Sequence, residues 1–409
     1  MSSGILNTAA LNAALVAPSV EGTLTRLMPG GNASMFALTS ALSKETALGT
    51  EHAFATVTMI FPQLTLSVAA LSTDNLLTVT SSVNIIPGQV FLVDTTNERV
   101  ILDSVVSPTQ VRVTRGVGST AAAIASGVSL WNIGNAYEEG SLRPQALAIN
   151  PVRISNLTQI FRNTWAITES ARATALLAGD NSYARSKQDC MKMHGIAMEQ
   201  DMIFGAKSNS FRNGQPLRTM DGFISIVSNL AYYPSYMAAA NVFTAGATTN
   251  WTQLETMLDM VFTQAADPGS TNERLLYVGS NAHKTINNIG RINSQYFMEN
   301  GQTEYGLQFS TFKTTRGKFT VMEHPLLNTN PTFAKMALAV DLRTMGVAYP
   351  QGRETKHKDF NSTTGEGATE AVDNGIDSTG GTLTTEFTLM VRNPPANAVI
   401  YNLTAAAVG

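Results

Sequence analysis

Residues 181–207 read NSYARSKQDCMKMHGIAMEQDMIFGAK and carry the strongest helical pattern in the sequence. Asn181 or Ser182 can cap the start of this helix, and Gly205 marks its end. Four residues at helical spacing share one of its faces: Met191, Gly195, Met198 and Met202. Methionine fills irregular gaps, so we interpret this face as core and not as a cofactor site.

The segment before this helix, Asn135 to Ile167, is predicted to be extended, because Pro144 and Pro151 disfavour helix at the residues before them. Apolar and aromatic side chains recur along it: Ile154, Leu157, Ile160, Phe161 and Trp165. Long extended stretches are uncommon inside compact domains. We therefore interpret them as strands of a protruding hairpin that lies on a neighbouring molecule, with Phe161 and Trp165 as candidate intersubunit contacts.

Two adjacent carboxylates, Glu138 and Glu139, lie in the same segment. Adjacent residues of a strand point to opposite faces, so these groups cannot readily cooperate as acid and base. We expect surface or intersubunit charges instead, with Arg143 and Arg153 as partners across an interface.

Residues 64–134 form a β-rich block further upstream. Turn signals such as Pro87-Gly88 and Arg115-Gly116 separate its short β-prone runs. These runs are Leu76–Val79, Val90–Val93, Arg99–Leu102 and Gln110–Thr114. Such spacing predicts a small antiparallel barrel or sandwich, inserted into a larger fold at about residues 66–134.

The chain after the long helix mixes helices and strands. Asn250 can cap a helix, with Gln253 at the capping-box position. Leu275–Val278 is predicted as a buried strand and Asn281–Ile292 as a helix. Asn361–Thr382 carries a flexible-loop signal. The strand candidates around this loop are Phe319–Val321, Ala337–Val340, Met345–Tyr349, Thr385–Val391 and Ala398–Leu403. The whole pattern predicts an α+β fold.

Composition points to a protein that hides much of its surface. Of 409 residues, 14% are charged and 44% are hydrophobic, whereas average chains carry about 25% charged residues. Large permanent interfaces are depleted in charge, so an obligate oligomer fits, as does an ordinary apolar-rich enzyme. A net charge of -3 argues against a dedicated nucleic-acid binder.

Cysteine, histidine and hydropathy patterns suggest no metal, cofactor or membrane. Cys190 is the single cysteine, and the five histidines show no ligand spacing. No apolar run is long enough to span a bilayer, and the start of the sequence lacks a signal peptide pattern. We expect an intracellular product without secretion.

Candidate catalytic and binding motifs are weak. Gly116, Gly118 and Ala121 match a dinucleotide fingerprint with Glu138 further on, but no proper helix follows them, so a hairpin turn is the favoured interpretation. Four acidic residues could suggest a calcium loop, yet they lack its pattern: Glu366, Glu370, Asp373 and Asp377. Two lone histidines could act as general bases, but no nucleophile motif accompanies them: His283 and His324.

Several strings resemble, in order and spacing, the major capsid (major head) proteins of tailed bacteriophages. They are Asn135-Ala136-Tyr137-Glu138-Glu139-Gly140, Asn156-Leu157-Thr158-Gln159-Ile160-Phe161, Ile167-Thr168-Glu169-Ser170-Ala171, Glu199-Gln200-Asp201 with Phe204-Gly205, and Met220-Asp221-Gly222-Phe223. The resemblance runs from about Gly134 to the C-terminus. It also covers the β-block, which ends its hairpin runs in Arg115-Gly116.

The resemblance implies the Hong Kong ninety-seven type capsid fold. It implies an N-terminal arm at 1–54 (otherwise a frayed terminus) and an extended loop at 55–167 that carries the inserted β-rich domain. A peripheral domain with the spine helix would occupy 168–213, and an axial domain 214–333. Residues 334–409 would return as peripheral-domain strands. Because the sequence starts at Met1 without a scaffold-like segment, a separate scaffolding protein is expected.

The resemblance also implies a function and partners. The chain would be a structural subunit, with no enzymatic activity, that assembles into hexamers and pentamers of an icosahedral head. It would be made in the bacterial host cytoplasm and act in the virion. Its partners would be other copies of the chain, a scaffolding protein, a portal, a decoration protein as an additional partner, and packaged double-stranded DNA, which would face the inner wall without sequence-specific binding. The alternatives are a tail-tube or decoration protein, or a nucleotide-binding enzyme that uses the Gly116 turn.

Overall fold

The computed structural model describes residues 42–57, 61–146, 151–173, 182–234, 237, 239–246, 249–263, 272–292, 299–300, 310–360 and 378–404. The chain divides into two compact units. The smaller unit spans Phe54–Ile154 and Leu230–Ala240, and the larger unit holds the described residues of Met1–Ala53, Ser155–Asn229 and Asn241–Gly409. Together their helices and strands confirm the predicted α+β class.

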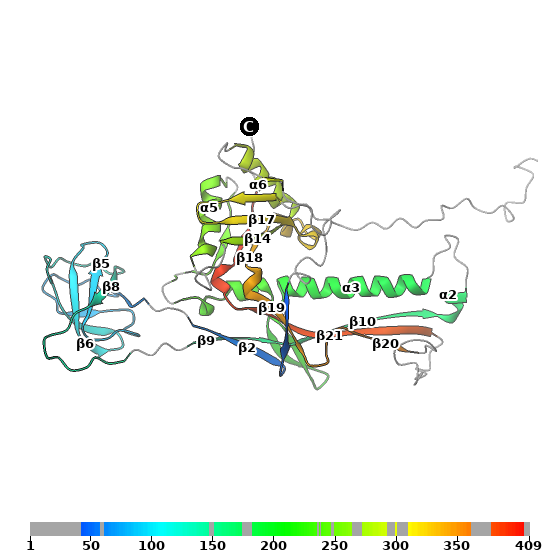
Figure 1. Ribbon diagram of the computed structural model, residues 1–409, viewed down its shortest axis with the longest axis horizontal. Coiled ribbons are helices and arrows are strands. Elements are labelled where there is room, and N and C mark those ends of the chain that lie inside the picture. The colour runs from blue at the N-terminus through cyan, green and yellow to red at the C-terminus, as the bar shows by residue number, and fades with distance from the viewer. Residues whose placement is uncertain are drawn as a thin grey trace, which may run out of the picture. The chain divides into compact units, whose positions relative to one another are not determined.

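Six short strands of the smaller unit form one antiparallel sheet (Figure 1). In sheet order they are β3 (Gln63–Thr65), β8 (Ser129–Asn135), β5 (Gln89–Val93), β6 (Arg99–Ser107), β7 (Gln110–Thr114) and β4 (Leu76–Thr78). An antiparallel bridge between Leu66 and Val79, which directly follow β3 and β4, joins the two ends of the sheet. The sheet therefore closes on itself, which removes exposed strand edges.

Inward-facing residues alternate along these strands and fill the interior. On β5 the alternation buries Phe91 and Val93, and on β7 it buries Val111 and Val113. All of them belong to one apolar cluster that includes no residue of the larger unit. The four β-prone runs predicted in this block are confirmed as strands, and β6 continues beyond its predicted end to Ser107.

The larger unit contains a five-stranded sheet. Its path is β1 (Ser43–Ala47), β19 (Met345–Pro350), β21 (Ser378–Val391) and β10 (Gln159–Thr168), and β20 (Lys356–Phe360) also pairs with β21. β10 and β21 are antiparallel in an unbroken register from Gln159 opposite Phe387 to Thr168 opposite Ser378.

The long helix α3 (Ser182–Phe204) lies along β10 (Figure 1). A small apolar cluster joins them, with Tyr183 packed against it: Trp165, Cys190 and Leu383. His194, on the buried face of α3, has one ring nitrogen 2.8 Å from Asn163 Oδ1 and the other 2.8 Å from Thr385 Oγ1. Burial lowers the pKa of His194.

The buried face of α3 coincides only in part with the predicted methionine face. Gly195 and Met202 are buried, but Met191 is 52% exposed. Polar side chains take part in the buried face, namely His194 and Glu199. Because hydrogen bonds satisfy these polar groups, they can occupy positions that a purely apolar pattern would assign to methionine.

A second, seven-stranded sheet completes the larger unit. In order its strands are β13 (Val242–Thr244), β22 (Ala398–Tyr401), β18 (Ala337–Val340), β14 (Glu273–Val278), β17 (Lys318–Glu323), β16 (Ser310–Lys313) and β15 (Glu299–Asn300). Helices α5 (Trp251–Asp259) and α6 (Ser280–Ile292) contribute Leu254, Leu258 and Ile286 to the core of this sheet. The capping box predicted for α5 is confirmed, since the Asn250 side chain accepts the Gln253 N–H at 2.9 Å.

Short elements connect these parts. β2 (Glu51–Thr56) pairs with β9 (Val152–Leu157), and β11 (Ser208–Arg212) pairs with β12 (Gln215–Thr219). The remaining helices among the described residues are α2 (Glu169–Ala173), α4 (Phe223–Ser228) and the single-turn segments Leu230–Tyr232, Met260–Phe262, Pro325–Thr329, Phe333–Lys335, Leu342–Thr344 and Pro394–Ala396.

Three expectations need correction. The segment predicted as a protruding hairpin up to Ile167 ends earlier, because β10 belongs to the five-stranded sheet. The predicted loop Asn361–Thr382 includes strand residues, since β21 begins at Ser378; residues 361–377 lie outside the described residues. The C-terminal strands do not all return to the sheet beside α3, because β18 and β22 lie in the seven-stranded sheet.

Candidate assembly surfaces

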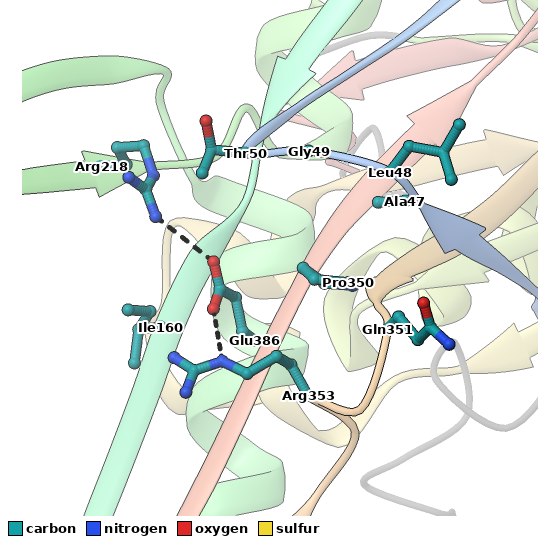
Figure 2. Close-up of a pocket in the computed structure, with 10 residues that line it drawn as sticks. All are labelled: Ala47, Leu48, Gly49, Thr50, Ile160, Arg218, Pro350, Gln351, Arg353 and Glu386. Carbon is teal, nitrogen blue, oxygen red and sulfur yellow. Dashed lines mark hydrogen bonds and ion pairs between the residues drawn. The ribbon is translucent and has the colours of Figure 1, made fainter.

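A cavity of about 430 Å³ opens on the larger unit between β10, β12, β19 and β21. Figure 2 shows Arg218 and Arg353 directed toward Glu386 from two sides. Arg218 comes from β12, Glu386 from β21, and Arg353 from the turn after β19. The segment Ala47–Thr50, which follows β1, forms another wall.

Glu386 is held as a carboxylate by three donors. Its Oε1 accepts from Thr158 Oγ1 at 2.8 Å and from Arg218 Nη2 at 3.3 Å, and its Oε2 accepts from Arg353 Nε at 2.8 Å. Burial raises the pKa of Glu386, but the hydrogen bonds and the two arginine charges outweigh it and hold that pKa below its usual value. One carboxylate against two guanidinium groups leaves one net positive charge at the cavity.

Apolar side chains at this cavity are open to solvent. Leu48 is 101% exposed and Ile160 is 48% exposed. A positively charged site beside exposed apolar groups is suited to a partner that carries both a carboxylate and an apolar side chain.

An acidic turn projects from the smaller unit. The Ser141 N–H donates to the Glu138 carbonyl at 3.1 Å, and Gly140 between them adopts a left-handed φ of 75°. That φ favours glycine and fits the third position of a type II turn. Glu138 and Glu139 are both exposed in this turn. The base of the turn is fixed, because the Tyr137 hydroxyl donates to the Pro87 carbonyl at 3.2 Å.

The predicted intersubunit contacts fall into two groups. Glu138, Glu139, Arg143 and Arg153 are exposed, and their role between subunits stays a prediction. The two aromatic residues have an internal role instead: Phe161 is buried and stacks on Phe387 with ring centroids 5.1 Å apart.

Trp165 is likewise buried, and its Nε1–H donates to His357 Nε2 at 3.1 Å. That nitrogen therefore carries no proton. Asp359 Oδ1 lies 3.3 Å from the same nitrogen and accepts no hydrogen bond within the described part of the chain. Both aromatic side chains thus stabilise the subunit's own sheet.

Each of the two histidines considered as general bases lies beside a glutamate of its own subunit. His324 is fully buried, its Nε2 lies 3.0 Å from Glu199 Oε1, and its Nδ1 accepts the Leu326 N–H. This pair ties α3 to the end of β17. His283 Nδ1 lies 3.7 Å from Glu323 Oε2 on the seven-stranded sheet.

The Gly116 turn holds an internal carboxylate. Arg115 binds the buried Glu98 through two contacts of 2.7 Å, and the N–H groups of Gly116 and Ala122 each donate to Glu98 at 3.1 Å. The amide that the dinucleotide hypothesis offers to a phosphate is therefore occupied. Sequence reasoning missed Glu98, as it missed Arg218, Arg353 and Glu386 at the cavity, because no local motif links partners so far apart in the chain.

Three strings of the predicted family pattern meet in the interior. The Asn156 side chain donates to the carbonyls of Asp221 and Leu389 and accepts the Asp221 N–H at 2.8 Å. A Cβ on Gly222 would lie 2.5 Å from the Gly205 nitrogen, so these two glycines allow close backbone approach. The strings therefore hold β9, α3 and α4 together.

The described residues contain no group of three or more His, Cys, Asp or Glu that could hold a metal ion. All four acidic residues considered as a calcium loop lie outside the described residues: Glu366, Glu370, Asp373 and Asp377. Among the described helices, none combines the length and the hydropathy that a bilayer span requires.

Comparisons with known proteins give consistent matches. The family model described as SU10 major capsid protein matches residues 4–404. The major capsid protein of Pseudomonas phage PaMx41 is 33% identical over 408 residues, which cover 98% of this chain and 96% of that protein. A solved structure from Mycobacterium phage Cain is 11% identical, with 99% of each chain covered and a TM-score of 0.48. The capsid of a native GTA particle is also 11% identical, with 99% and 100% covered and a TM-score of 0.47.

Proposed function

The chain belongs to the SU10 major capsid protein family, and from this premise we propose that its copies form the hexamers and pentamers of an icosahedral phage head enclosing double-stranded DNA. The protein is a phage major capsid protein, the repeated structural subunit of the virion shell, and not an enzyme. A shell made of one repeated subunit requires surfaces on each copy that bind other copies.

The β11–β12 hairpin is the observation that best supports such surfaces. Most of its residues are exposed, including Phe211 at 76% and Leu217 at 43%. An isolated two-stranded hairpin is only marginally stable in water. Its left-handed Asn213-Gly214 turn, with φ of 51° and 73°, fixes its shape without burying Phe211. A neighbouring subunit that covers the hairpin would supply the missing burial.

Family resemblance supports an assignment of the elements to the domains of the capsid fold. The five-stranded sheet with α3 corresponds to a peripheral domain with its spine helix, and the seven-stranded sheet with α5 and α6 to an axial domain. The β2–β9 ribbon corresponds to an extended loop that carries the closed six-stranded sheet as an insertion. Residues 1–54 would be the N-terminal arm, most of which lies outside the described residues.

The same family resemblance supports further partners during assembly. We expect a scaffolding protein and a portal, with a decoration protein as an additional surface partner, and synthesis in the bacterial host cytoplasm. Packaged DNA would face the inner wall without sequence-specific binding, which is consistent with a net charge of -3.

Family membership decides against the alternatives. A tail-tube or decoration protein would belong to another family, and the match covers residues 4–404. A nucleotide-binding enzyme would need the Gly116 amide free for phosphate, but Glu98 occupies it.

Sedimentation and negative-stain microscopy of the purified chain, produced with the neighbouring genes of its operon, test the proposal. The unmodified chain and Phe211→Tyr, which keeps the aromatic ring, should form fast-sedimenting closed particles. Phe211→Ser should lose most of them. If Phe211→Ser forms particles as abundantly as the unmodified chain, the hairpin is not part of an interface between subunits. An unmodified chain that stays monomeric when it is produced with these genes would refute shell formation.

A further inference from the structure

We propose that the acidic turn Glu138–Ser141 of one copy inserts a carboxylate into the Arg218–Arg353 cavity of a second copy. This contact rests on the proposed function, because it assumes that copies of the chain associate. It assigns a role to the solvent-exposed donors of this cavity and to an acid pair that makes no ion pair in the described residues.

The cavity is a carboxylate site with unused donors. Arg218 donates from Nε to the Thr158 carbonyl and from Nη2 to Glu386. Arg353 donates from Nε to Glu386. The Nη1 of Arg218 and both Nη groups of Arg353 donate to no group in the described chain. The Arg353 side chain is 47% exposed, so these donors can be reached from solvent. Guanidinium groups bind carboxylates through two parallel hydrogen bonds, and Arg353 can offer such a pair.

The acidic turn is the segment that best complements this site. Two other exposed acids already have partners within their own subunit: Glu45 pairs with Arg392 and Glu273 with Lys318. Glu138 and Glu139 are adjacent and exposed, and neither makes an ion pair in the described part of the chain.

The turn is also presented in a fixed shape, which lowers the entropy lost on binding. The Tyr137 ring lies so close to Gly88 that a Cβ on Gly88 would approach it to 2.3 Å. Gly140 sets the turn, as described above.

Apolar groups match as well. Leu142, next to the turn, is 92% exposed. On the cavity side Leu48 is fully exposed and Ile160 is half-exposed. A carboxylate of the turn would contact the two arginines, while Leu142 would contact the apolar side chains of Leu48 and Ile160. Contact between them would shield the ion pair from water, which strengthens it.

The two partners of this contact are different surfaces of the same chain. Such a heterologous contact propagates from copy to copy and closes a ring when the rotation allows it. Rings of five or six subunits require contacts of this kind.

Thiol cross-linking tests the contact directly. Cys190 is the single cysteine and is buried, so a short bismaleimide will react mainly with introduced cysteines. In assembled particles, Glu139→Cys/Arg353→Cys should give a ladder of multimers on a denaturing gel. Glu139→Cys and Arg353→Cys alone should give none. Particles that form but yield no ladder, or yield only internally linked monomer, would overturn this contact and leave the proposed function intact.

Charge reversal provides an independent test if the variant with both cysteines does not assemble. Glu138→Lys/Glu139→Lys and Arg353→Glu should each reduce the particle yield at least about tenfold. Combining the turn reversal and Arg353→Glu in one chain should restore particles, because the charges of the turn and the cavity are then exchanged in every copy. Asp94→Lys, a reversal at another exposed acid of the smaller unit, should leave the yield unchanged. Equal yields for the turn variant and Asp94→Lys would overturn the contact, whereas absence of particles from the unmodified chain would refute the proposed function.

Discussion

At the scale of single residues, three buried acidic side chains lie beside a buried arginine or histidine. Glu98 with Arg115, Glu199 with His324, and Arg274 with Asp341 are each buried pairs. Breaking a buried pair leaves a charge without a partner in a medium of low polarity. These pairs therefore make the subunit sensitive to single substitutions far from any interface.

Glu98→Ala should strongly destabilise the smaller unit. The variant leaves Arg115 buried without its carboxylate and frees the N–H groups of Gly116 and Ala122, at a cost of about 3–5 kcal/mol in the free energy of unfolding. Denaturant unfolding measures this loss. Asp94→Ala, an exposed carboxylate nearby, is the matched control and should change stability by less than about 0.5 kcal/mol. Equal effects would contradict the role given to Glu98.

Asp201 makes stability depend on pH. Burial raises the pKa of Asp201 to about 6, although a hydrogen bond from Gln159 opposes this, and its Oδ2 has no hydrogen-bond partner in the described chain. The folded state thus binds a proton more tightly than the unfolded state, in which the carboxyl has its ordinary pKa of 3.8. Stability contributed by this group is full below about pH 4 and falls as the pH rises to about 6.

Asp201→Asn should therefore raise the free energy of unfolding at pH 7 by about 1–3 kcal/mol and change it little at pH 4. Thermal unfolding of both proteins across this pH range measures the difference. A variant that is less stable than the unmodified chain at pH 7, or a difference independent of pH, would show that Asp201 is not a buried, desolvated carboxylate.

At the scale of elements, sequence patterns predicted what is decided locally. The Asn250–Gln253 capping box and strand β7 were predicted correctly because their signals lie within a few residues. The buried face of α3 was predicted only in part because its polar members, His194 and Glu199, are hydrogen-bonded to residues far away in the sequence. The Arg218–Glu386–Arg353 cavity could not be predicted for the same reason, since three separate elements supply it.

The junction between β14 and α6 tolerates only glycine. A Cβ on Gly279 would lie 2.5 Å from the backbone of Ala334, which cannot move as a side chain can. Gly279→Ala should cost at least about 1–3 kcal/mol in stability, the usual range for overpacking a core. Gly246→Ala is the control, because no atom lies within 4 Å of its added Cβ. Similar melting temperatures for both variants, by calorimetry, would contradict this packing.

At the scale of the whole molecule, the two units have separate cores. The apolar cluster of the closed six-stranded sheet draws only on residues between Leu64 and Leu130. A fragment of residues 61–146 should therefore fold alone and unfold cooperatively, as followed by circular dichroism and hydrogen exchange. A fragment without exchange-protected amides would show that the sheet depends on the larger unit.

Elements such as β11–β12 and the Glu138 turn expose side chains that other copies can cover, so we expect assembly to complete the burial of these surfaces. Low overall charge is consistent with such a surface. Stability of the shell would then come from many repeated contacts rather than from one strong site.

Cryo-electron microscopy of particles assembled from the unmodified chain tests this account most directly. We predict closed shells with icosahedral symmetry, built from five-fold and six-fold rings of a subunit with the two sheets and the α3 helix described above. Open tubes, stacked rings without five-fold vertices, or a uniform field of monomers would contradict it.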